Sequence, residues 1–391
     1  MTLVAAVGYA QDLDAREASL KAAHTALNQM GNVSPSVAVV ISPYRFDAQM
    51  VLGGATSLLS NIPILGFSSP ATLTDAGYHT NTVVVALLGG EEIQAETHWF
   101  SAYSQASADA ATRIQQLIGY EQRPVRSVLA FADGLNGNTE EFCQSLPATI
   151  QIFGGLATGD AQNSLGYQFS GVQSGNGGMA SAFLRGGYKF GLGYGHGWSP
   201  IGNHFRVTRS RGFWLRTLDG RPASEAYSRL FGYSPREWAF PPLNYTTRLY
   251  PLGFEQPDSD EIQIRSPLRV EADGSFRMNA PLRDGSDAYL MVGNPTSCLE
   301  AVKNAVQQAV LGLEGAKPVF ALVLVDVAWQ MLLQARPGAE IKTIQEILGT
   351  DIPIAGGYTL GQIAPARHAD ETPQFLNQHF MIALFGTTEE Q

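Results

Sequence analysis

Residues 352–357 read Ile352-Pro353-Ile354-Ala355-Gly356-Gly357, and the same design occurs twice earlier, as Ile62-Pro63-Ile64-Leu65-Gly66 and as Ile150-Gln151-Ile152-Phe153-Gly154-Gly155. Each stretch is a short apolar strand that ends in glycine. A design that recurs along one chain indicates an internal repeat, in which every copy contributes the same structural unit. We therefore expect three related units.

The surroundings of these strands repeat as well. Continuous apolar runs open the three copies at 37–41, 128–133 and 319–326, helical stretches follow at about 46–60, 138–147 and 338–348, and apolar return runs close the copies at 83–88, 178–184 and 379–385. Such runs are typical of strands that helices cover in a buried sheet. The predicted fold class is α+β with an α/β-like character: two domains of repeated strand–helix–strand units with mixed, largely buried sheets.

The glycines that end these strands have two interpretations. They allow a turn with positive φ, or they allow another backbone to approach closely. Side-by-side strand ends would form a shallow cleft, and open α/β sheets usually bind ligands at such strand ends.

The middle of the chain, from about 186 to 285, has a different pattern. Phe205-Arg206-Val207-Thr208-Arg209 alternates, and Asp-Gly pairs at 219–220, 273–274 and 284–285 indicate tight turns between short strands. The change of pattern predicts a domain boundary near residue 200, with one domain over 1–200 and a second over 201–391.

Composition excludes several classes of protein. The 391 residues are 45% hydrophobic and 15% charged, which suits a large core, and the net charge of -10 disfavours nucleic acid and anionic membranes as partners. Two distant cysteines make no disulfide framework. The first residues lack a basic n-region, and no apolar run approaches the ~20 residues that cross a bilayer. We expect a cytoplasmic protein.

An ordered series of motifs resembles the FIST family of bacterial signal transduction, over most of the chain. The matching pieces are Ile64-Leu65-Gly66-Phe67-Ser68-Ser69, Asp133-Gly134, Gly154-Gly155-Leu156-Ala157-Thr158-Gly159-Asp160, His196-Gly197-Trp198-Ser199-Pro200-Ile201-Gly202, Leu218-Asp219-Gly220-Arg221-Pro222-Ala223 and Gly356-Gly357-Tyr358-Thr359-Leu360-Gly361-Gln362-Ile363. The order of the pieces is more specific than any single piece.

The resemblance implies an N-terminal and a C-terminal sensory domain that bind a small ligand, with amino-acid-like compounds among the family's proposed ligands. No output domain is recognisable in the sequence, so the signal would pass to a separate protein, such as a sensor histidine kinase or a cyclic-dinucleotide enzyme. Some members are haem-binding nitric-oxide sensors, which makes haem an alternative cofactor. A homodimer is a further alternative.

The chain departs from the family pattern at two points. The family has a Cys and an Arg after the third opening strand, where this chain reads Val325-Asp326-Val327-Ala328-Trp329-Gln330, and the family's Gly-Glu-Ile is Gly361-Gln362-Ile363 here. A missing thiol, cation and carboxylate change the charge and hydrogen bonding of a site. The resemblance therefore does not transfer a ligand identity.

Several polar residues are candidate ligand contacts. Asp133, Asp160 and Asp326 follow apolar strands or glycine turns and could accept hydrogen bonds from an ammonium or hydroxyl group, or could be turn and capping acids. Arg265 could pair a ligand carboxylate, or could form an ion pair between domains. Tyr358 and Gln362 follow the glycines of the third copy and are expected to line the cleft.

His196 is the candidate haem ligand, since one protein histidine is enough to hold a haem. Aromatic residues surround it in the sequence, among them Tyr194, Trp198 and Phe205, and Trp198 is a further candidate ligand contact. The alternative is that His196 is a turn residue whose ring bonds a backbone carbonyl.

Enzyme motifs are mostly absent. The sequence has no phosphate-binding Gly-rich loop that ends in Lys-Ser or Lys-Thr, no Gly-x-Ser-x-Gly elbow and no zincin motif. We therefore predict no catalytic residues, and a hydrolase-like enzyme remains an alternative to the sensory function.

Overall fold

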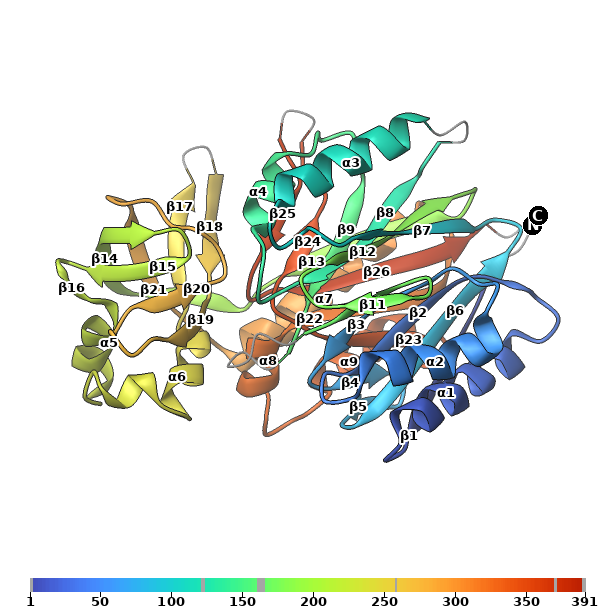
Figure 1. Cartoon of the computed structure of the whole chain (residues 1–391), viewed down its shortest axis with the longest axis horizontal. Coiled ribbons are helices and arrows are strands. Elements are labelled where there is room, and N and C mark those ends of the chain that lie inside the picture. Colours follow the sequence, from blue (N-terminus) through green and yellow to red (C-terminus); the bar gives the residue numbers. More distant parts are fainter. Residues whose placement is uncertain (1–2, 121–123, 160–165, 257–258, 369–370, 389–391) are drawn as a thin grey trace. The chain divides into compact units, whose positions relative to one another are not determined.

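The computed structural model describes residues 3–120, 124–159, 166–256, 259–368 and 371–388 (Figure 1). The chain divides into two compact units, which do not coincide with its two halves. Unit 1 comprises Met1–His196, Leu299–Phe375 and His379–Gln391, and unit 2 comprises Gly197–Cys298 and Leu376–Gln378. Residues 299–375 thus return to the unit in which the chain began.

Unit 1 contains the three repeats. The first comprises β1 (Leu3–Gln11), α1 (Ala15–Met30), β2 (Pro35–Pro43), α2 (Ala48–Leu59), β3 (Ile64–Ser69), β4 (Thr72–Thr74), β5 (Gly77–His79) and β6 (Thr82–Gly90). The second comprises β7 (Gln94–Phe100), α3 (Ser107–Tyr120), β8 (Ser127–Asp133), α4 (Thr139–Gln144), β9 (Ile152–Ala157), β10 (Gln168–Ser170), β11 (Gln173–Gly175) and β12 (Met179–Arg185). The third comprises β13 (Lys189–Gly195), α7 (Pro295–Gly312), β22 (Lys317–Asp326), α8 (Val327–Leu332), α9 (Ala339–Leu348), β23 (Ile354–Thr359), β24 (Gln362–Ala364), β25 (Gln374–Leu376) and β26 (Phe380–Thr387).

Each repeat builds a sheet with the same strand order. The orders are β1-β6-β2-β3, β7-β12-β8-β9 and β13-β26-β22-β23, and the last two strands of each are parallel. The short strands after β3, β9 and β23 extend the sheet of another repeat: β10 pairs with β3, β24 with β9, and β4 with β23. The three sheets are therefore interlocked in a cyclic order.

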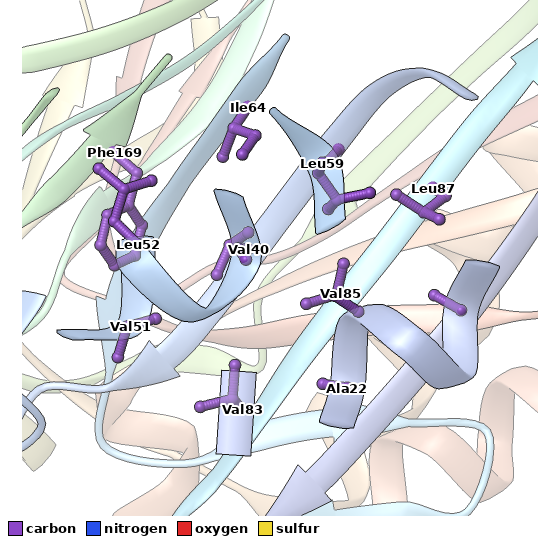
Figure 2. Close-up of a cluster of buried hydrophobic side chains, with 14 of the residues drawn as sticks. Ala22, Val40, Val51, Leu52, Leu59, Ile64, Val83, Val85, Leu87 and Phe169 are labelled. Carbon is purple, nitrogen blue, oxygen red and sulfur yellow. The ribbon is translucent and has the colours of Figure 1, made fainter. Parts of the chain in front are cut away.

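Helices cover the outer faces of the sheets. In the first repeat, α1 and α2 lie side by side over the sheet (Figure 1), and Asp14 and Asp47 cap their N-termini with side-chain hydrogen bonds. Figure 2 shows the core beneath them, where Ala22 and Leu52 from the helices face Val40, Val85 and other strand residues. Alternate residues of each strand face this layer, as a pleated strand requires.

The inner faces of the three sheets meet at the centre of unit 1. Apolar side chains from all three sheets surround a cavity of only ≈ 10 Å³: Val37, Val39, Leu88, Ile93, Leu129, Leu184, Phe320, Leu322 and Phe385. The sheets are thus buried on both faces, which confirms the prediction from the continuous apolar runs and the predicted α+β class.

The repeated glycines lie inside β3, β9 and β23 and not at their ends as predicted, and close backbone approach explains them. A Cβ atom on Gly66 would lie 1.9 Å from the Val40 carbonyl oxygen of the neighbouring strand, and one on Gly154 would lie 1.8 Å from the Ala130 oxygen. The predicted shallow cleft is wrong. Strands β3, β9 and β23 lie in three different sheets, and every residue in them is buried.

Unit 2 is a smaller β structure inserted between β13 and α7. Its elements are β14 (Trp198–Arg211), β15 (Trp214–Leu218), β16 (Arg221–Pro222), α5 (Ala223–Phe231), α6 (Leu243–Thr246), β17 (Leu252–Gln256), β18 (Ser259–Arg265), β19 (Pro267–Val270), β20 (Phe276–Met278) and β21 (Asp287–Gly293), with 3-10 turns at Glu237–Ala239 and Thr247–Leu249. Its core gathers Val207, Tyr227, Trp238, Phe276 and their neighbours. Within the described part of the chain, no helix has the length and apolarity to cross a bilayer.

Candidate functional site

A layer of polar groups joins the three repeats where β3, β9 and β23 end. The Tyr358 N–H donates to Ser69 Oγ at 2.8 Å, and Thr158 Oγ1 donates to the Tyr358 carbonyl oxygen at 2.8 Å. Ser68 Oγ donates to the Thr158 carbonyl oxygen at 2.6 Å. Each repeat is thus hydrogen-bonded to the other two. These bonds give the buried polar atoms partners, and without partners their burial would destabilise the fold.

Beside this layer, the buried side-chain amide of Gln362 has a hydrogen-bond partner for its nitrogen but none for its oxygen among the described residues. Gln362 Nε2 donates to Thr359 Oγ1 at 2.9 Å, while Gln362 Oε1 has no hydrogen-bond partner among the described residues. Gln362 is fully buried. An unsatisfied buried acceptor costs about 1–3 kcal/mol, so this oxygen is a ready acceptor for a donor group.

The neighbouring strand brings Asp326 to the same place. Thr359 and Asp326 are paired in the parallel register of β22 and β23. The Asp326 N–H donates to the His379 carbonyl oxygen at 2.9 Å, and the rings of His379 and His196 lie edge to face with centroids 4.9 Å apart. We call these five residues, Asp326, Thr359, Gln362, His379 and His196, the Asp326 cluster.

The side chain of Asp326 also has a structural task. It is the N-cap of α8 and accepts a hydrogen bond from the Ala328 N–H at 3.0 Å. The carboxylate satisfies one of the free N–H groups at the start of that helix. Asp326 is therefore both a helix cap and a member of the Asp326 cluster.

Asp133 occupies the equivalent position in the second repeat, at the end of β8. Its carboxylate accepts from the N–H groups of Leu135, Asn136 and Gly177 and from Asn136 Nδ2. Burial raises the pKa of Asp133, and these hydrogen bonds work against that shift. The carboxylate thus organises its own turn and holds the Gly177 segment.

We expect Asp133→Asn to destabilise unit 1 by about 1–3 kcal/mol, because an amide nitrogen placed in the position of Oδ2 would face two donors, the Gly177 N–H and Asn136 Nδ2. Urea unfolding followed by circular dichroism measures the change. An unchanged midpoint and slope would show that the turn does not depend on this carboxylate.

Tyr358 was predicted as a cleft residue, and its ring is buried on the helix side of β23. Its hydroxyl donates to the carboxyl of Glu340 in α9, a residue that the sequence interpretation missed. Burial raises the pKa of both groups, and Glu340 Oε2 has no partner among the described residues. The available signal was position: Glu340 lies four residues before the buried Ile344, on the apolar face of the helix.

The other predicted residues lie elsewhere. Trp198 and Arg265 belong to unit 2, where Trp198 Nε1 donates to the Leu249 carbonyl oxygen at 3.3 Å and Arg265 Nη1 donates to the Ile264 carbonyl oxygen at 3.1 Å. Asp160 lies outside the described residues. Unit 1 therefore gathers Asp326, Gln362 and His196 in one cluster, and holds Tyr358 and Asp133 apart from it.

His196, the candidate haem ligand, lies in unit 1. The ring of His379 contacts the rings of both His196 and Tyr194, whereas Phe205 is part of the core of unit 2. A surface hollow of ≈ 400 Å³ is lined by Gln49, Leu52, Gly53, Thr56, Val172 and Ser174, far along the chain from His196. Among the residues that the structure describes, no group of three or more His, Cys, Asp or Glu side chains is placed to hold a metal ion.

Comparisons with known proteins complete the assignment. No curated protein matches the chain. Similar solved structures include a chorismatase, at 10% identity and a TM-score of 0.38 over 99% of this chain and 100% of that one. A cyanuric acid hydrolase from A. caulinodans is also similar, at 8% identity and a TM-score of 0.36 over 99% and 100%. The FIST N domain model matches residues 36–221 and the FIST C domain model matches residues 223–365. Because these two matches span most of the chain, this protein belongs to the FIST family.

Proposed function

We propose that this chain binds a small ligand at the Asp326 cluster and passes the signal to a separate protein. FIST domains are sensory domains that bind small ligands. The observation that supports this site is the unused oxygen of the buried Gln362, whose amide nitrogen donates to Thr359, the residue paired with Asp326. The Gln362 oxygen and the Asp326 carboxylate, both linked to Thr359, suit a ligand with N–H donors, such as the ammonium group of an amino-acid-like compound.

The route to the site would pass the histidines. His196 is partly exposed, His379 is nearly buried and Gln362 is fully buried. A ligand would therefore meet the imidazole rings first and Gln362 last. Neutral imidazole offers one donor and one acceptor, so it could bond a carboxylate or an amine of the ligand.

The signal would begin at the N-terminus of α8. A ligand cation that engages the Asp326 carboxylate competes with the Ala328 N–H for the same oxygens. Binding then changes the capping of a helix, which is a local two-state event with an energy of about 1 kcal/mol. A sensor histidine kinase or a cyclic-dinucleotide enzyme in the cytoplasm would be the partner that responds.

The hydroxyl groups nearby support binding more than catalysis. Ser69 Oγ and Thr158 Oγ1 both donate to backbone carbonyl oxygens, of Ala71 and Tyr358. A serine or threonine nucleophile needs a hydrogen bond to a general base instead. The hydrolase alternative is therefore not favoured.

The test compares two equivalent aspartates. A thermal-shift and calorimetry panel of free amino acids is measured with the unmodified protein, with Asp326→Asn and with Asp133→Asn. We expect one or more amino acids to raise the melting temperature of the unmodified protein, and Asp326→Asn to weaken that ligand about tenfold or more, as loss of a charged partner does. Asp133→Asn should be less stable but should keep the affinity.

Two outcomes would contradict the proposal. If Asp133→Asn and Asp326→Asn lost affinity equally, the ligand would not recognise the Asp326 cluster. If no amino acid in the panel bound at millimolar concentration, the amino-acid-like ligand would be wrong. Gln362→Leu provides a second check, because it removes the buried acceptor and leaves Asp326 in place.

A further inference from the structure

Unit 2 carries a row of charged and aromatic side chains on the face of its sheet that is turned away from the core. The row crosses four neighbouring strands, β14, β15, β20 and β19. Its cross-strand pairs are Arg211 with Trp214, Trp214 with Arg277, and Arg277 with Arg269. Directly paired residues in antiparallel strands point to the same face. We call these four residues the Arg211 row.

The adjacent row of residues on these strands shows which face of the sheet is turned toward the core. Leu215, Phe276 and Val270 are paired with one another across β15, β20 and β19, and all three are buried in the core of unit 2. Because side chains alternate along a strand, the Arg211 row lies on the opposite face. Arg211 is exposed and Trp214 is 38% exposed, as an outer face requires.

The row is held in place by stacking. The Arg277 guanidinium contacts two aromatic rings, with Cζ 4.4 Å from the Phe213 centroid and 4.5 Å from the Trp214 centroid. Cation–π contacts of this kind are worth about 0.5–2 kcal/mol each. They fix a half-exposed tryptophan beside a cation, which is the composition of an interaction hot spot.

The positive charge of the row is poorly compensated. Arg269 pairs with Glu271 at 3.0 Å, whereas Arg211 has no ion pair with any described residue, and Arg277 Nη1 has no hydrogen-bond partner among them. Burial, with the charge of Arg269 as the second cause, lowers the pKa of Arg277. The segment from Arg206 to Arg216 contains no acidic residue, although the whole chain has a net charge of -10. Acidic residues outside the segment pair with its two ends, Asp287 with Arg206 and Asp273 with Arg216. An anion at the row would relieve this repulsion.

We propose that the Arg211 row docks an acidic peptide segment of a partner protein, with its carboxylates on the arginines and an apolar residue against Trp214. Four strands at a spacing of ~4.8 Å give a row about 14 Å long, which fits a short extended segment. A long nucleic acid would extend beyond the row over the surface of an acidic protein, which disfavours it. The surface goes beyond the proposed ligand site and does not depend on the ligand.

The test uses the full chain and fluorescence anisotropy at low salt, with fluorescein-labelled hexaglutamate as the probe and labelled oligothymidylate as the comparison. The variants are Arg211→Glu and Trp214→Ala. The matched control is Arg236→Glu, which makes the same change of charge at an exposed residue of unit 2 outside the row. We expect Arg211→Glu to weaken hexaglutamate binding about tenfold, Trp214→Ala to weaken it about threefold and Arg236→Glu to change it by less than about twofold.

Three results would overturn the proposal. The first is no anisotropy change with hexaglutamate for the unmodified protein. The second is an equal loss in Arg236→Glu, which would show that only net charge matters. The third is tighter binding of oligothymidylate than of hexaglutamate, which would assign the row to nucleic acid. Circular dichroism of each variant shows that unit 2 is still folded, so that a loss of binding is attributable to the row.

Discussion

Gly66→Ala is expected to reduce the free energy of unfolding by about 3 kcal/mol or more, although the change adds only one methyl group. The added Cβ would lie 1.9 Å from the Val40 carbonyl oxygen, across the parallel pair of β2 and β3. Both strands are buried, so neither backbone can move without disturbing the layers on either side. The clash would separate the central strands of the first repeat.

The matched control lies in the same repeat. Gly53 is within α2, and a Cβ atom there would meet nothing within 4 Å. Gly53→Ala should therefore stabilise the protein by about 0.5–1 kcal/mol, because alanine favours the helix. Chemical unfolding measures both variants. Equal effects of the two substitutions would mean that the strand backbones are not in close contact at Gly66.

Glu340→Gln is expected to stabilise the protein at pH 8 and to remove a pH dependence from its stability. Burial raises the pKa of Glu340 above its ordinary value of 4.5. The folded state therefore holds a proton that the unfolded state releases, and stability falls as the pH rises from 4.5 to the folded pKa. Glutamine keeps an oxygen that accepts from the Tyr358 hydroxyl and carries no charge to bury.

The measurement is the difference in unfolding free energy between Glu340→Gln and the unmodified protein at several pH values. We expect about 1–3 kcal/mol in favour of the variant at pH 8, decreasing toward zero near pH 4.5. Subtracting the two curves cancels Asp133, whose pKa burial also raises. A difference that does not vary with pH would mean that the pKa of Glu340 is the same in the folded and unfolded states.

Tyr358→Phe is the companion variant. It removes the hydroxyl that donates to Glu340 and leaves both carboxyl oxygens without a described partner. Its stability should decrease at every pH, and most at high pH, where the carboxyl is charged. An effect opposite in sign to that of Glu340→Gln at pH 8 would separate the cost of the charge from the contribution of the hydrogen bond.

Much of the candidate site could not be predicted because similar sequence contexts have different partners. Asp133 and Asp326 both end an apolar strand, so the sequence predicts the same position and the same role for both. The fold gives Asp133 the Gly177 N–H, from the segment before β12, and makes Asp326 the cap of a helix beside His379. The Gly177 N–H that bonds Asp133 comes from a segment more than 40 residues away in the sequence. The Ala328 N–H that bonds Asp326 is local, but it is available only because a helix begins there.

The sequence by itself determined the three repeats, the strands buried on both faces and the resemblance to the FIST family. These follow from apolar periodicity and from an ordered series of motifs, which are local properties of the chain. Only the tertiary structure decided that β4, β10 and β24 extend the sheets of other repeats, and that residues 299–375 return to unit 1. An apolar pattern predicts that a strand is buried. It does not predict the pairing partner, because several strands of this chain have the same length and pattern. That choice depends on backbone hydrogen bonds and packing between segments that are distant in sequence.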